Sequence, residues 1–192
     1  MGHHAVSRLT RIALLITALV GVFAECTITL PYLLLGTQLD VLPALLVYAG
    51  MSTELGFIVL LSLVGGLVMD SLSANPLGVS ILPLMIIGLL VYFLRELLLR
   101  DQVTAQSFLG LLAGAIAPAL TLLLILIAAG ADVERPLIGW QSLWQWGVMA
   151  VSSALFTPIV FVAFDRFDRT FSFQPYKRPG FRTDREMVRS RR

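Results

Sequence analysis

Charged residues are scarce in this chain of 192 residues, at 14% against about 25% in soluble domains. There is one cysteine, Cys26, which excludes a disulfide framework and a multi-cysteine metal site. The two histidines, His3 and His4, adjoin each other near the start of the chain, and we assign them no catalytic role. Because the sequence also shows no nucleophile–base pair, metal-ligand cluster or phosphate-binding loop, we expect no enzymatic activity, no metal and no cofactor.

Hydrophobic residues make up 57% of the chain, and the mean hydropathy of +0.86 is typical of an integral membrane protein. A membrane-spanning helix needs about 20 apolar residues, within a range of about 17–25. The sequence predicts an all-α polytopic membrane protein with six transmembrane helices. The predicted segments are 12–30, 41–51, 55–69, 76–94, 108–129 and 143–164, of which the second and third are short for independent spans.

The second and third segments are interpreted as two separate helices, with a re-entrant hairpin or one long helix as alternatives. Gly50 and Gly56 flank a polar break in the apolar sequence, and Ser52 or Thr53 would cap a new helix at that break. The first segment begins like a signal peptide, after Arg8 and Arg11. Its apolar run continues past Cys26, so we expect a retained first helix.

The distribution of positive charge predicts the topology. Arg8 and Arg11 precede the first segment, Arg95 and Arg100 follow the fourth, and nine of the fourteen Lys and Arg lie after Phe164. Cytoplasmic loops carry excess Lys and Arg, so six crossings with both termini in the cytoplasm fit best. This predicts a short cytoplasmic N-terminus (1–10), a six-helix domain (11–164) and a basic cytoplasmic tail (165–192).

The basic tail is predicted to contact anionic lipid or an acidic cytoplasmic protein, because each Lys or Arg near an anionic leaflet contributes about 1 kcal/mol. Pro and Gly residues break the tail early, so it is predicted to be extended or disordered. We expect no nucleic-acid binding. The tail residues proposed for these contacts are Arg166, Arg169, Lys177, Arg178 and Arg182.

The stretch GGLVMDSLSANPLGVS, residues 65–80, places a carboxylate between two apolar segments. Asn75 is a favourable N-cap and Pro76 a favourable first helical residue, which predicts a tight hairpin with a connection of only 71–74. Asp70 could then accept hydrogen bonds from free N–H groups at the start of the fourth helix. Gly65 and Gly66 would allow close helix approach. The sequence leaves open whether Asp70 only locks this corner or also contacts a partner or ligand.

Three further features each have two interpretations. Glu25 either extends to interfacial water or lines a cavity and pairs with polar groups of another helix. Gly110 and Gly114, extended by Ala117, form a GxxxG surface for packing within the bundle or against another subunit. The three tryptophans, Trp140, Trp144 and Trp146, indicate an outer aromatic belt or a sugar- or lipid-binding platform.

Gly66-Leu-Val-Met-Asp70 followed by Asn75-Pro76-Leu77-Gly78 resembles the hairpin of the bacterial rod shape-determining MreD family. The order of the helices is also similar, with a Pro-x-Leu-Leu-Val-Tyr run at 43–48 and Phe-Asp-Arg at 164–166. The resemblance covers about residues 8–169, and Asp70, Pro76 and Gly78 match the motif. It implies a fold similar to the substrate-binding subunits of energy-coupling-factor transporters.

The resemblance implies a non-enzymatic, multi-pass component of the bacterial inner membrane that maintains rod shape during cell-wall elongation. Its implied partners are membrane lipids, an MreC-like bitopic protein, a SEDS-type glycosyltransferase, a class B penicillin-binding protein and an MreB-type filament. Two alternatives remain open at this point. One is a vitamin-type binding subunit of a membrane transporter, and the other is a membrane enzyme acting on lipid-linked sugars through Asp70 and Glu25.

Overall fold

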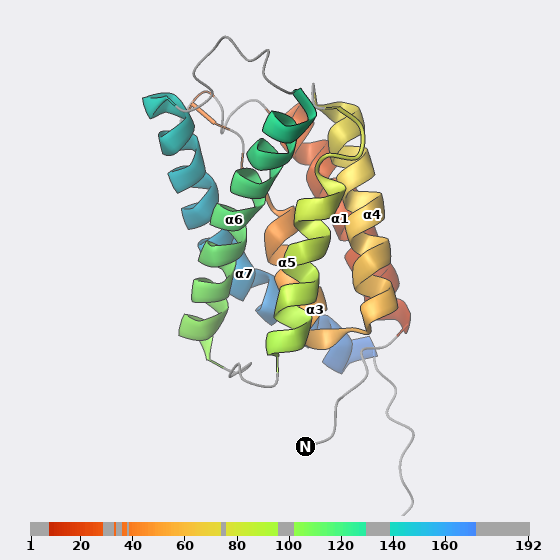
Figure 1. Ribbon diagram of the computed structural model, residues 1–192. Helices are drawn as coiled ribbons and strands as arrows, with labels where there is room; N and C mark the ends of the chain where they lie inside the picture. The colour runs from red at the N-terminus through yellow and green to blue at the C-terminus, as the bar shows by residue number, and fades with distance from the viewer. Residues whose placement is uncertain are drawn as a thin grey trace, which may run out of the picture.

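The computed structural model describes residues 8–28, 33, 36–37, 39–73, 76–95, 102–129 and 139–171. Six helices run through these residues as an elongated bundle (Figure 1). The helices are α1 (Arg8–Thr27), α3 (Leu42–Ser52), α4 (Leu55–Leu72), α5 (Ile81–Leu94), α6 (Val103–Ala129) and α7 (Trp140–Phe171). Each helix overlaps one of the six predicted segments, in order, so the prediction of an all-helical fold is confirmed.

Four of these helices, α1, α4, α6 and α7, are long and apolar enough to cross a membrane, whereas α3 and α5 are shorter. The prediction that the fourth segment spans comfortably and the third does not is therefore wrong. Helix α4 has 18 residues because it continues through Asp70 to Leu72, and α5 has only 14 because it begins at Ile81. Exposed apolar side chains such as Ile16, Leu63 and Leu155 cover the outside of the bundle, as a lipid environment requires.

Helix α3 forms the centre of the bundle. All eleven of its residues are buried, and it packs against α1, α4, α5, α6 and α7. At about 1.5 Å per residue it is about 16 Å long, which is half the thickness of a bilayer core. The Tyr48 ring lies 5.0 Å from the Phe161 ring and 5.3 Å from the Phe164 ring, between ring centroids. This aromatic cluster fixes α3 against α7.

The break between α3 and α4 lies at Thr53 and Glu54, whose backbones are extended, so two separate helices are confirmed. The predicted capping role of Ser52 or Thr53 is wrong. Ser52 is the last residue of α3, and the Thr53 hydroxyl donates back to the Ala49 carbonyl at 2.7 Å. Glu54 is the residue that precedes α4, and its side chain makes no capping hydrogen bond.

Helix α1 begins and α7 ends at the same end of the bundle, which we call the terminal end. The Thr10 hydroxyl donates to Asp168 Oδ1 at 2.7 Å, and Arg11 Nη2 donates to Glu54 Oε1 at 2.8 Å. Arg95, at the end of α5, donates to the Thr53 carbonyl at 3.3 Å. The helices therefore alternate in direction along the chain.

The helices extend beyond the predicted domain limits at both ends. Helix α1 already begins at Arg8, and α7 continues to Phe171. Asp165 accepts a hydrogen bond from the Tyr48 hydroxyl at 3.4 Å, and Asp168 contacts Thr10 as described above. These contacts hold the last turns of α7 against the bundle, so an extended tail from residue 165 is wrong for 165–171.

Candidate functional site

Asp70 lies in the last turn of α4 and is 2% exposed. Its Oδ2 atom accepts hydrogen bonds from the Gly78 N–H at 2.8 Å and the Ser80 N–H at 3.1 Å. The carboxylate therefore fastens the turn that precedes α5 to the end of α4. Its other oxygen, Oδ1, is buried and has no hydrogen-bond partner among the described residues.

Glycines permit the close approach of chain segments at this corner. A Cβ atom at Gly66 would lie 2.9 Å from the Ile81 Cα atom, and one at Gly65 would lie 2.9 Å from the Leu42 side chain. Gly78 has φ of +94°, a conformation that residues with a side chain rarely adopt. Gly66, Asp70 and Gly78 thus each have a structural role in one corner.

The predicted helix start at Asn75 and Pro76 is wrong. Residues 77–80 form turns, and α5 begins only at Ile81, after Ser80. Pro76 is exposed and lies before these turns, while Asn75 lies outside the described residues. The connection between α4 and α5 is consequently longer than the predicted 71–74.

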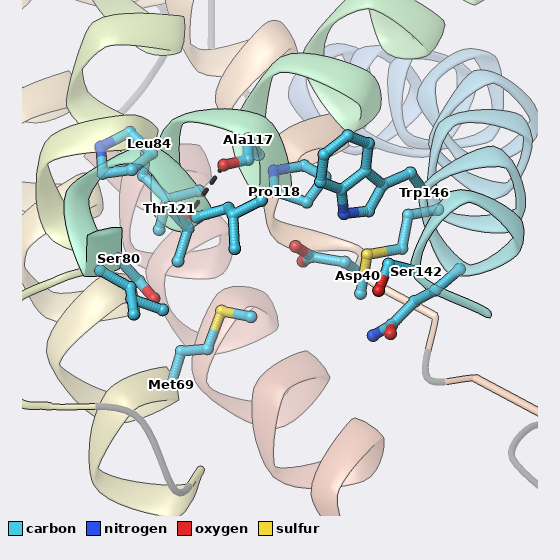
Figure 2. Close-up of a pocket in the computed structure, with 14 residues that line it drawn as sticks. Asp40, Met69, Ser80, Leu84, Ala117, Pro118, Thr121, Ser142 and Trp146 are labelled. Atoms are coloured by element: carbon cyan, nitrogen blue, oxygen red, sulfur yellow. Dashed lines mark hydrogen bonds between the residues drawn. The ribbon is translucent and has the colours of Figure 1, made fainter. Parts of the chain in front are cut away.

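A cavity of about 300 Å³ lies at the end of the bundle opposite the terminal end, next to this corner. Its wall is formed by the residue before α3 and by parts of α4, α5, α6 and α7, and Figure 2 shows the side chains that face it. Most of the wall is apolar, including Met69, Leu84 and Pro118. The polar lining residues are Asp40, Ser80, Thr121, Ser142, Gln145 and Trp146.

Asp40 is the carboxylate that faces this cavity, and it is 8% exposed. Its Oδ1 atom accepts the Leu42 N–H at 3.0 Å, which helps to start α3. Burial raises the pKa of Asp40 to about 6, against the opposing effect of the Leu42 hydrogen bond. Glu25 on α1 lies close enough to Asp40 for the two carboxylates to repel each other, and Glu25 Oε1 accepts the Val41 N–H at 2.6 Å.

The contact with Val41 favours the second interpretation of Glu25, in which it pairs with polar groups of another segment. Glu25 is partly buried beside the residues that open α3. Glu25 does not line the cavity. The carboxylate that lines it is that of Asp40.

Gly110 and Gly114 pack within the bundle, against α7. A Cβ atom at Gly110 would meet the Thr157 side chain and the Ser153 carbonyl, and one at Gly114 would lie 2.7 Å from the Met149 carbonyl. The same face of α6 continues to Ala117, which lines the cavity. Since α6 and α7 form the most extensive helix pair, the GxxxG surface is occupied internally.

No known protein family, curated protein or solved structure matches this chain. The resemblance to the MreD family therefore rests on the hairpin residues and on the order of the helices alone.

The remaining basic and tryptophan residues from the sequence analysis lie in different parts of the molecule. Arg166 and Arg169 are exposed on the last turns of α7, whereas Lys177, Arg178 and Arg182 lie outside the described residues. Trp140 and Trp144 are exposed at the start of α7, and Trp146 lines the cavity.

Within the described residues no group of three or more His, Cys, Asp or Glu side chains could hold a metal ion.

Sequence reasoning missed the cavity and the role of Asp40. The position of Asp40, shortly before Pro43 in a helix start, is the sequence signal that its side chain could bind the first N–H groups of α3. Ser80 and Trp146 give no sequence signal for a shared site, because they lie 66 residues apart and reach the same cavity only through the packing of α5 and α7 against α6.

Proposed function

We propose that this chain is a non-enzymatic scaffold of the bacterial cell-elongation machinery, of the MreD type, in the inner membrane. In this role its six helices cross the membrane and both termini lie in the cytoplasm. Its partners are an MreC-like bitopic protein and, through that protein, the peptidoglycan polymerase pair and an MreB-type filament.

One observation carries the proposal: Asp70 binds the Gly78 and Ser80 N–H groups of the following connection. The motif residues that produce the resemblance, Gly66, Asp70 and Gly78, thus belong to one corner, in which the carboxylate holds backbone rather than facing open solvent. A carboxylate in this position suits a rigid structural element better than an acid–base catalyst.

The occupied GxxxG surface restricts where a partner helix could bind. Gly110 and Gly114 contact α7, so a bitopic partner would pack on helix faces that are open to lipid. Arg166 and Arg169, which are exposed at the terminal end, remain free to contact anionic lipid or acidic cytoplasmic proteins.

Affinity purification of the tagged chain in mild detergent, followed by mass spectrometry, tests the proposal. We expect an MreC-like single-span protein to co-purify with the wild type and with the control Gly147→Ala, which adds a methyl group where nothing lies within 4 Å. Recovery with Asp70→Ala should fall, because the corner loses two hydrogen bonds to a charged group. Recovery of a transporter's ATPases in place of the single-span protein would overturn the assignment.

A further inference from the structure

Asp40 presents an unused hydrogen-bond acceptor to the cavity. Its Oδ1 atom is bound by the Leu42 N–H, and Oδ2 makes no hydrogen bond with any described residue. The side chain is more than nine-tenths buried, and its carboxylate points into the space between α6 and α7 (Figure 2). A buried carboxylate without a counter-charge is unfavourable, so this atom favours a cationic hydrogen-bond donor.

The described residues supply no cation at this end of the bundle. Glu25, Asp40 and Asp70 lie here, and of these three Asp40 is the one that lines the cavity. The arginines that the structure describes lie at the terminal end, on the first turn of α1, at the end of α5 and on the last turns of α7. They are Arg8, Arg11, Arg95, Arg166 and Arg169. Among the described residues, the Asp40 carboxylate therefore has no positively charged neighbour.

Trp146 adds a second feature that selects a cation. Its indole ring lies on the cavity wall beside Asp40 (Figure 2), and an indole face attracts an ammonium group within about 6 Å. Ser142 and Gln145 place further polar groups on the same side of the cavity. A carboxylate together with an aromatic ring is a common arrangement for recognising organic ammonium groups.

The opposite wall is apolar and limits the size of the ligand. Met69, Leu84, Leu122 and Ile125 line it, and the Thr121 hydroxyl is already bonded to the Ala117 carbonyl at 3.0 Å. A volume of about 300 Å³ is at the small end of ligand pockets. The cavity therefore suits a short apolar body attached to one charged group.

We propose that this cavity binds a small amphipathic organic cation, whose ammonium group lies between Asp40 and Trp146 and whose apolar part lies along α5 and α6. The ammonium group could belong to a free amine or to the headgroup of phosphatidylethanolamine. The proposal does not depend on the scaffold function, because co-purification of a partner protein measures a different surface.

Thermal unfolding of the purified full-length protein in a non-ionic detergent, titrated with hexylammonium or with uncharged 1-hexanol, tests this site. A ligand that binds only the folded state raises the midpoint in proportion to its occupancy. Hexylammonium should stabilise the wild type in a saturable manner and 1-hexanol should not. Equal stabilisation by the two compounds would overturn the proposal.

Three variants locate the binding. Asp40→Asn keeps an acceptor for the Leu42 N–H but removes the charge, and it should weaken hexylammonium binding at least tenfold. Trp146→Leu should weaken binding by about three- to tenfold. The control Glu54→Gln removes one negative charge at the terminal end, where the side chain is exposed, and it should change affinity less than twofold. Unchanged affinity in both cavity variants would overturn the proposal. If Asp40→Asn does not fold, unchanged affinity in Trp146→Leu alone would overturn it.

The source of the ammonium group is determined in nanodiscs of phosphatidylglycerol with and without phosphatidylethanolamine. If phosphatidylethanolamine lowers the apparent affinity for hexylammonium in the wild type, the lipid headgroup occupies the site. If hexylammonium binds with the same affinity in both membranes, the site takes a free amine.

Discussion

Asp70 is the residue on which the corner between α4 and α5 depends. From the preceding helix it satisfies two backbone N–H groups of the turn at residues 77–80. Near lipid, water would not satisfy these N–H groups. Without Asp70, leaving them without hydrogen bonds would therefore cost much free energy. The same carboxylate leaves Oδ1 without a described partner, which makes the corner sensitive to replacement.

Replacement of Asp70 should therefore destabilise the protein in a graded way. Asp70→Ala removes both hydrogen bonds to a charged group and should lower the free energy of unfolding by about 3 kcal/mol. Asp70→Asn keeps an acceptor oxygen and should cost less. Chemical unfolding in mixed micelles measures both values, and an Ala variant as stable as the wild type would show that the corner is held by other contacts.

Gly78 should tolerate a side chain poorly because of its φ of +94°. Gly78→Ala is expected to cost about 1–3 kcal/mol, as for other residues forced into this conformation. Gly147→Ala is the matched control: this helical position is open, so alanine should be neutral or slightly stabilising there. The same unfolding assay compares the two, and equal stability of both variants would contradict the proposed strain at Gly78.

Asp40 should make stability depend on pH. Its pKa in the folded protein is about 6, above the ordinary value of 3.8, mainly because burial disfavours the charged form. Between these two values the folded state binds more protons at Asp40 than the unfolded state does. The free energy of unfolding is therefore highest below about pH 4 and falls as the pH rises through about 6. Among the described residues, Glu25 is the titratable side chain that faces Asp40.

Thermal midpoints measured from pH 4 to pH 8 test this dependence. The wild-type midpoint should fall across the range, and Asp40→Asn should reduce the fall. An unchanged slope in this variant would show that other groups control the pH dependence.

At the scale of secondary-structure elements, the α6–α7 pair depends on small residues. Gly110 and Gly114 bring α6 so close to α7 that a Cβ atom at either position would contact α7 backbone. Gly114→Ala should cost about 1–3 kcal/mol through overpacking, whereas Gly56→Ala on the open face of α4 should not. Comparable loss in both variants would contradict this packing.

The type and order of the elements could be predicted from apolar length, but their ends could not. The sequence favours a helix start at Pro76, yet Asp70 binds the N–H groups of Gly78 and Ser80 and stabilises a turn there, so α5 starts at Ile81. Contacts between residues distant in sequence also hold the end of α7, where Asp168 meets Thr10 across the bundle. Such side-chain contacts between distant residues leave no periodic pattern in the sequence.

At the scale of the whole molecule, the bundle has two chemically different ends. The terminal end carries the described arginines, together with the Arg11–Glu54 ion pair. The opposite end carries the Asp70 corner and the cavity with Asp40. The sequence predicts this division of charge, because the number of helices between two charged segments determines whether they lie at the same end. The cavity could not be predicted, because it forms only when α3, α4, α5, α6 and α7 pack together.

The proposed six-crossing topology places the Asp70 corner and the end of α7 on opposite sides of one membrane. Cys26→Ser provides a cysteine-free chain, into which Leu77→Cys, exposed beside the corner, or Phe171→Cys, exposed at the end of α7, is introduced singly. Each variant is reacted with a membrane-impermeant maleimide in sealed vesicles of known orientation. We predict that the two positions react from opposite sides. Reaction of both from the same side would contradict the six-crossing bundle.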